Sequence, residues 1–180
     1  VQDGDVFIYA KIGDNLFYSS TGGSSWIQKV HSGTYLFGIN SFNSSNKNPN
    51  YVAMGGLDVY KSTNGGSSWG LVNNWYQYYN DMYNYLHADI PEIQWFVDPE
   101  NNDEFALIST DGGLYWANSQ LSNVNNLSMD GLGVSQYYST YTMQTNPHLI
   151  WAGAQDQGFQ RSLNDDDGIL NFIQLISGDY

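Results

Sequence analysis

The chain has 180 residues, of which 41% are hydrophobic and 16% aromatic, so it can bury the core of at least one domain and lacks the composition of a disordered segment. Its formal net charge is −13 with only five Lys and Arg residues, which argues against binding to nucleic acid or to anionic membranes. It has no cysteine, hence no disulfide or thiolate metal site, and no apolar run near the roughly 18 residues that span a bilayer.

Short β-rich runs alternate with polar turns along the chain. These runs share β-branched and aromatic residues and are flanked by Gly, Asn or Ser. The predicted strands are 6–12, 16–19, 26–30, 35–40, 51–55, 59–62, 69–72, 104–109, 114–117, 137–144, 149–154, 159–162 and 172–176. Their order predicts about four small antiparallel sheets, the first of which lacks its opening strand.

Residues 73–95 interrupt this pattern, because they are dense in Tyr and Trp and show no clean alternation. We expect a long inter-strand loop here, and insertions of this kind often build the binding face of a repeat protein. The alternative is a short helix or loop that is packed by its own aromatic side chains.

One short string occurs twice, as SSTGGSSW at residues 19–26 and as STNGGSSW at residues 62–69. The two closing tryptophans, Trp26 and Trp69, are 43 residues apart, a spacing typical of propeller blades, which repeat every 40–50 residues or so. The repeat therefore predicts consecutive blades of a β-propeller, each a four-stranded antiparallel sheet.

The repeated string resembles the Asp-box, S-x-D-x-G-x-x-W, of sialidase-type (BNR repeat) β-propellers. In that family the box forms the turn between the outer two strands of a blade, and its role is structural. Gly supplies the positive φ of such a turn, and Ser and Asn accept local N–H groups. The third position departs from the family, because Thr21 and Asn64 stand where Asp is usual. The predicted structural residues are Ser19, Gly23, Trp26, Ser62, Asn64, Gly66 and Trp69.

Three further segments are similar to secreted bacterial propeller proteins related to the Vps10/sortilin type. Residues 109–116 fit the box by letter, but strand order places residues 111–113 between the second and third strands, as in the DGG-Y turn of those proteins. Residues 136–162 resemble their QFY … NP … GTQDNGTQRS segment, and residues 87–93 resemble their HADxHxI segment without its second His. The resemblance implies an extracellular or cell-surface protein from a bacterium.

The candidate site residues lie mainly in the aromatic insertion. An exposed platform for ligand stacking is predicted from Trp75, Tyr76, Tyr78, Tyr79 and His87. His87 and Asp89 alone do not make a metal site, which normally needs three or more ligands, so no metal is assigned. The acidic run Asp165, Asp166 and Asp167 could attract Ca²⁺ or could be a solvated turn, and no other cofactor is expected.

A catalytic role has weak support in the sequence. A sialidase uses three arginines, and this chain has a single one, Arg161. Glycoside hydrolysis needs two carboxylates across a cleft, for which Asp89 and Glu92 are the candidates, but the sequence places no pair.

We therefore predict an all-β chain of about four blades of a larger β-propeller, completed by further propeller sequence or by another chain. The expected blades are residues 1–33, 34–75, 90–132 and 133–180, with the aromatic insertion at about 73–95. The expected function is a non-catalytic module that binds protein or glycan through its loop face. The alternative is a fragment of a BNR-type glycoside hydrolase that acts on extracellular polysaccharide.

Overall fold

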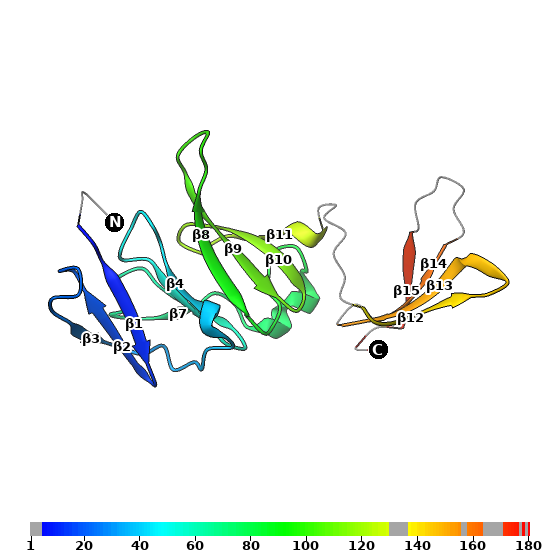
Figure 1. The fold of residues 1–180 in the computed structure, drawn as a ribbon, viewed down its shortest axis with the longest axis horizontal. Helices are drawn as coiled ribbons and strands as arrows, with labels where there is room; N and C mark the ends of the chain where they lie inside the picture. The colour runs from blue at the N-terminus through cyan, green and yellow to red at the C-terminus, as the bar shows by residue number, and fades with distance from the viewer. Residues whose placement is uncertain (1–4, 130–136, 156–157, 164–170, 177, 179) are drawn as a thin grey trace. The chain divides into compact units, whose positions relative to one another are not determined.

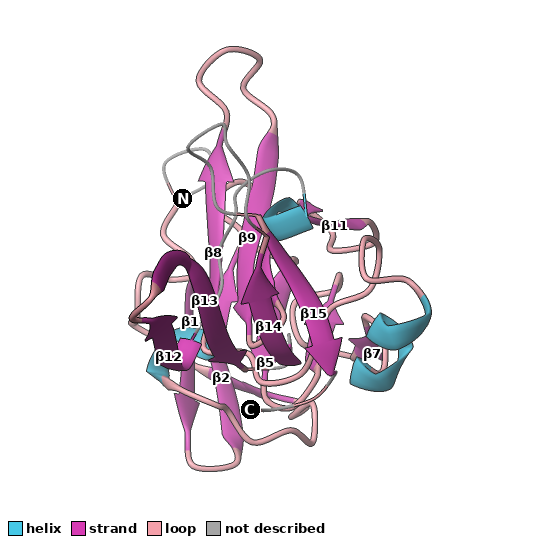
Figure 2. Cartoon of the chain, turned by 90° about the vertical axis from the view of Figure 1, so that its right-hand side faces the viewer, coloured by secondary structure: helices cyan, strands magenta, loops and turns pink. Residues whose placement is uncertain are grey.

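The computed structural model describes residues 5–129, 137–155, 158–163, 171–176, 178 and 180. Strands dominate it, and the remaining regular structure in this part of the chain is three short 3-10 helices, η1 (Ile39–Ser41), η2 (Trp75–Asn80) and η3 (Leu127–Met129) (Figure 2). The chain forms two compact units, Val1–Leu132 and Gly133–Tyr180. The described residues contain no helix that is both long and apolar enough to cross a membrane.

Four antiparallel sheets follow one another along the chain, each built from strands that are consecutive in sequence (Figure 1). The first has three described strands, β1 (Ile8–Ile12), β2 (Asn15–Ser19) and β3 (Ile27–Lys29). The second contains β4 (Phe42–Ser44), β5 (Val52–Gly55), β6 (Val59–Ser62) and β7 (Gly70–Leu71). The third contains β8 (Glu92–Val97), β9 (Glu104–Thr110), β10 (Gly113–Asn118) and β11 (Val124–Asn126). The fourth, in the second unit, contains β12 (Tyr137–Met143), β13 (Asn146–Ala154), β14 (Gly158–Ser162) and β15 (Phe172–Ile176).

This series of four-stranded meanders confirms the predicted fold class, an all-β chain made of β-propeller blades. The first sheet has one strand fewer than the others among the described residues, as the strand order predicted. The division of the chain into blades at the predicted residue boundaries stays a prediction.

The core of the first unit lies between the second and third sheets. Alternate residues of β8 and β9 point into it, including Ile93, Trp95 and Ile108, each of them at most 2% exposed. Ala53 and Val59 meet them from the second sheet. The indole Nε1 of Trp95 donates to the Ser119 carbonyl oxygen at 3.1 Å, so this large side chain is buried without losing its hydrogen bond.

Two of the segments that differ from the sequence prediction bear on the candidate site. Residues 35–40 are not a strand. They form an extended loop that ends in η1, and β4 begins only at Phe42. A strand is expected here because each blade should open with a separate inner strand, but the side chains of Tyr35, Phe37 and Ile39 are exposed. Residues 92–95, which were assigned to the aromatic insertion, belong to β8, where Ile93 and Trp95 are buried and Glu92 faces outward.

The two Asp-box-like turns, residues 19–26 and 62–69, have matching hydrogen bonds. The Ser62 hydroxyl accepts the N–H groups of Asn64 (3.3 Å) and Gly66 (2.9 Å), and the Ser19 hydroxyl does the same for the first turn. Asn64 Oδ1 accepts the Ser68 N–H at 2.9 Å. Both glycines of each turn have positive φ, from 62° to 95°, which explains why Gly occupies these positions.

The tryptophans that close the two turns behave differently. Trp69 Nε1 donates to the Val30 carbonyl oxygen of the preceding sheet at 2.7 Å, and the Val30 N–H donates to Gly66. Trp26 Nε1 donates instead to the carbonyl oxygen of Gly23 in its own turn, and its side chain is 44% exposed. The second box thus connects two sheets, whereas the first closes on itself.

Candidate functional site

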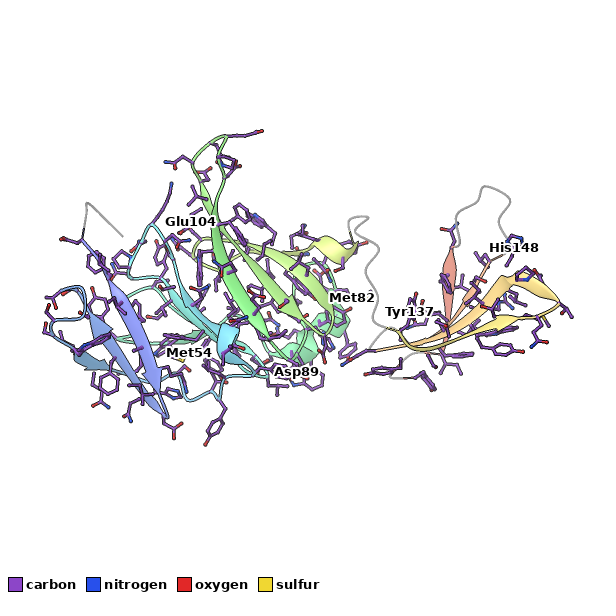
Figure 3. The ribbon with its side chains drawn as sticks, viewed as in Figure 1. Met54, Met82, Asp89, Glu104, Tyr137 and His148 are labelled. Carbon is purple, nitrogen blue, oxygen red and sulfur yellow. The ribbon has the colours of Figure 1, made fainter. Side chains whose placement is uncertain are left out.

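The loops at one end of the second and third sheets form the candidate site. In a four-stranded meander, the turn between strands two and three lies at the same end as the connections into the first strand and out of the fourth. We define the end face as the loops 34–41, 55–58, 74–91 and 111–112, which occupy these positions in the two sheets. Figure 1 shows η2 at the end of the third sheet from which β8 starts, and Figure 3 labels Asp89 there and Glu104 toward the opposite end.

Backbone hydrogen bonds hold three of these loops side by side. The N–H groups of Asp89 and Ile90 donate to the carbonyl oxygens of Leu57 (3.1 Å) and Gly56 (3.0 Å). The Phe37 N–H donates to Gly55 at 3.0 Å. Because these bonds join segments more than 15 residues apart, the end face is held in place from several directions.

Side chains complete the attachment of the first loop. The buried Ser41 hydroxyl donates to the Ile90 carbonyl oxygen at 2.6 Å and accepts the Gly38 N–H at 2.8 Å. The hydroxyl both donates and accepts a hydrogen bond, so its burial leaves no polar group unsatisfied and the contact stabilises the loop.

The aromatic helix η2 is anchored at its start, and the loop that contains it is closed by a side-chain contact. The Asp58 carboxylate accepts the Trp75 N–H at 2.7 Å, which ties the start of η2 to the β5–β6 turn. The buried Asn73 side chain accepts the Leu86 N–H and donates to the Leu86 carbonyl oxygen, both at 3.0 Å. The insertion is thus a short helix and an ordered loop, which was the alternative left open by the sequence.

His87 lies at the centre of the predicted aromatic platform. Its ring packs edge-on against Tyr78, with ring centroids 4.7 Å apart, and against Trp75 and Tyr79 at 6.4 and 5.9 Å. The Tyr79 hydroxyl lies 3.3 Å from Nε2 of His87. His87 and Tyr78 are buried, whereas Tyr76 and Tyr79 are 56% and 60% exposed. The structure therefore brings the five predicted residues together but divides them into an inner support and an outer surface.

Several exposed apolar side chains of the end face were not predicted as site residues. Tyr35 and Ile39, on the loop before β4, are 79% and 93% exposed, and Phe37 and Leu57 are also more than half exposed. Their sequence signal is the apolar run at residues 35–39, which sequence analysis assigns to the inner strand of a blade. Large apolar side chains gathered at one place on a surface are typical of an interaction site.

The end face carries negative charge. Its loops contain four aspartates, Asp58, Asp81, Asp89 and Asp111, and no Lys or Arg. Burial raises the pKa of Asp58 above its ordinary value, although the hydrogen bond from Trp75 opposes this shift. The side-chain hydrogen bond from Asn84 lowers the pKa of Asp81, and the N–H groups of Tyr83 and Asn84 act in the same direction.

The two candidate catalytic carboxylates lie in different surroundings. Asp89 belongs to the end face and has a positive φ of 59°, a conformation that Asp tolerates better than most residues. Glu92 lies on β8 and lines a shallow depression of about 170 Å³ together with Phe96, Leu107 and Leu114, and Asp89 is not part of that lining. Whether the two residues act as a pair stays a prediction.

No three His, Cys, Asp or Glu side chains of the described residues gather closely enough to hold a metal ion. The candidate calcium ligands Asp165, Asp166 and Asp167 lie outside the described residues.

The second unit has an open surface of its own. Tyr141, Trp151 and Phe159 line a depression of about 570 Å³ on the fourth sheet, and the rings of Tyr141 and Trp151 are 5.9 Å apart. These residues come from three neighbouring strands of one sheet, and that position is typical of a blade face rather than of a loop site.

The consecutive sheets and the loop face at their ends define the chain as a β-propeller-type repeat protein. No protein-family model and no curated protein matches it. Among solved structures, it is similar to YCF48 from Cyanidioschyzon merolae, with 14% identity and a TM-score of 0.38, over 89% of this chain and 53% of that one. It is also similar to YCF48 bound to D1 peptide, with 8% identity and a TM-score of 0.26, over 88% of this chain and 61% of that one. The chain thus covers less than two thirds of either structure, and the resemblance to Asp-box and Vps10-type propellers stays a prediction.

Proposed function

We propose that this chain is a non-catalytic binding module that takes a protein or glycan ligand on its end face. The observation that carries the proposal is the group of exposed apolar and aromatic side chains on loops that are held by backbone hydrogen bonds and by the buried side chains of Ser41 and Asn73. Tyr, Trp and Phe are the residues enriched at binding hot spots, where they supply large contact areas at low cost in side-chain entropy.

The support beneath these side chains is consistent with binding. Trp75 packs edge-on against Tyr76 and Tyr79, with ring centroids 6.2 and 6.1 Å apart, and it is itself tied to Asp58. Aromatic rings that are fixed before the ligand arrives lose less freedom on binding, so preorganisation of this kind favours affinity.

The test uses two probes, a displayed library of random 12-residue peptides and a panel of soluble polysaccharides. Ligands selected on the wild-type protein are then measured against a Tyr35→Ser/Tyr76→Ser variant by calorimetry. We expect the dissociation constant to rise at least about tenfold, as for loss of a hot-spot aromatic residue. The matched control is Tyr141→Ser, which removes a tyrosine 61% exposed from the second unit and should leave binding unchanged.

The proposal fails if every selected ligand binds the double variant as well as it binds the wild type. Circular dichroism and urea unfolding of each variant separate a lost binding surface from a lost fold.

The hydrolase alternative makes a different prediction for the same polysaccharides. If Asp89 and Glu92 were an acid and a base, the wild type would release reducing ends, and Asp89→Asn and Glu92→Gln would each abolish the release. A binding module releases none, so a reducing-sugar assay distinguishes the two functions.

The proposal also covers where the protein is located and how its propeller is completed. The resemblance of residues 87–93 and 136–162 to exported bacterial propeller proteins supports a secreted or cell-surface location. The sheets described here would then form part of a larger propeller, completed by further propeller sequence or by another chain. Protease treatment of intact source cells, followed by detection of this chain, tests the location.

A further inference from the structure

The end face is both apolar and acidic, and this combination restricts its ligand. Four aspartates and no Lys or Arg lie in the loops that build it, and the whole chain carries a formal net charge of −13. An anionic ligand would meet repulsion from these carboxylates, whereas a cationic ligand would be attracted and steered toward them.

The carboxylates differ in the hydrogen bonds that they already accept from other groups of the protein. Asp58 accepts the Trp75 N–H, and Asp81 accepts the N–H groups of Tyr83 and Asn84 and the side chain of Asn84. Asp89 is half-buried, and its backbone N–H, not its carboxylate, makes the bond to the Leu57 carbonyl oxygen. Of these three carboxylates, that of Asp89 is therefore the best placed to accept a donor from a ligand.

The exposed tyrosines favour the same kind of ligand. A guanidinium or ammonium group is attracted to the face of an aromatic ring, and the attraction is stronger where carboxylates lie nearby. Tyr76 and Tyr79 provide such rings on the exposed side of η2, while Tyr35, Phe37 and Ile39 offer apolar contact on the loop before β4. A neutral glycan could stack on the rings and donate hydroxyl groups to a carboxylate, but it carries no positive charge to offset the charge of the aspartates.

We propose that the ligand of the end face is an extended peptide segment of a partner protein in which Arg or Lys alternates with apolar side chains. This inference rests on the proposed function and specifies its ligand. The apolar side chains of the peptide contact the loop before β4, and its cations lie over the tyrosines of η2 and beside Asp89.

The experiment uses the peptides selected from the random 12-residue library on the wild-type protein. Their sequences are compared with the unselected library, and their dissociation constants are measured by calorimetry at 50 and 500 mM NaCl. We expect enrichment in Arg and Lys and weaker binding at the higher salt concentration, because screening reduces attraction between exposed charges.

Asp89→Asn tests the named carboxylate, because Asn keeps the shape of Asp and also tolerates a positive φ. We expect it to weaken binding by about threefold, the size of an exposed charge contact. The matched control is Asp103→Asn, which removes the same charge from an exposed position in the β8–β9 turn, at the other end of the third sheet, and should leave binding unchanged.

Each outcome supports or overturns a stated claim. Basic peptides that lose affinity in Asp89→Asn but not in Asp103→Asn support the inference. Ligands that depend on Tyr35 and Tyr76 but are not basic, or are glycans, overturn the inference and leave the proposed function intact. If no ligand depends on Tyr35 and Tyr76, both fail.

Discussion

At the scale of single residues, Gly112 makes room for His87. A Cβ atom at position 112 would lie 2.5 Å from Cβ and 2.8 Å from Cγ of His87, closer than side-chain atoms approach in folded proteins. Both atoms belong to the buried base of the aromatic cluster, so His87 cannot move aside without disturbing Tyr78 and Trp75.

We therefore expect Gly112→Ala to lower the free energy of unfolding by about 1–3 kcal/mol, as for other overpacked interiors. Urea unfolding followed by tryptophan fluorescence measures the change. The control is Gly70→Ala, because a Cβ at the exposed position 70 meets nothing within 4 Å. Equal stability of the two variants would show that His87 is loosely held.

Two aspartates of the end face should respond to pH in opposite directions. Burial raises the pKa of Asp58 above its unfolded value, because the fold disfavours the ionised carboxylate. The contribution of the Asp58 carboxyl to the free energy of unfolding is therefore lost as the pH rises. Hydrogen bonds from Asn84 and Tyr83 lower the pKa of Asp81, so its contribution is present above its ordinary value of 3.8 and lost as the pH falls.

The measurement is the free energy of unfolding of Asp58→Asn and Asp81→Asn, each relative to wild type, between pH 3 and pH 6. As the pH rises, Asp58→Asn should gain stability relative to wild type and Asp81→Asn should lose it. Parallel slopes would contradict the assigned environments of the two carboxyls.

At the scale of the elements, the Ser of each box carries the turn. The Ser62 hydroxyl is buried and accepts the N–H groups of Asn64 and Gly66, which have no other acceptor in the turn. Removal of the hydroxyl leaves a buried N–H unsatisfied, so Ser62→Ala should lower the free energy of unfolding by about 1–3 kcal/mol. Thermal and urea unfolding test this, with Ser67→Ala in the exposed part of the same turn as the control, for which we expect almost no change.

The same turns show why part of this fold could be predicted from sequence. A box turn is specified within eight residues, because its Ser, Asn and Gly contact one another through local hydrogen bonds and positive φ angles. The blade spacing follows from the repeat of that string. Trp75, Tyr78, Tyr79 and His87 could also be grouped in advance, because they lie within 13 residues of one another.

The loop before β4 could not be predicted in the same way. The apolar run at residues 35–39 is compatible with a strand, but it does not say whether a buried sheet or solvent lies beside it. The contact that fixes this loop, from Ser41 to Ile90, joins residues 49 positions apart. Because Tyr and Trp are dense before Pro91, sequence analysis extends the aromatic insertion to residue 95. The start of β8, with Ile93 and Trp95 on its buried face, is therefore missed.

At the scale of the whole molecule, the excess of negative charge should dominate the response to salt. Like charges repel one another in the compact state, and this repulsion is screened over about 10 Å at 0.1 M ionic strength. Since the net charge is −13, the melting temperature at pH 7 should rise between 20 and 500 mM NaCl. Differential scanning calorimetry measures it, and a falling melting temperature would mean that attractive ion pairs outweigh repulsion. Salt should therefore strengthen the fold while it weakens binding of a basic peptide.

The two box tryptophans give the molecule a pair of optical reporters. Trp69 is hydrogen-bonded across to Val30 of the neighbouring sheet, whereas Trp26 is bonded within its own turn and 44% exposed. Iodide should therefore quench the emission attributable to Trp26 more than that of Trp69. A further sheet that lay against the first sheet as the first lies against the second would cover Trp26 and shift its emission to shorter wavelength. The emission wavelength of Trp26 would then show directly whether another blade packs against the first.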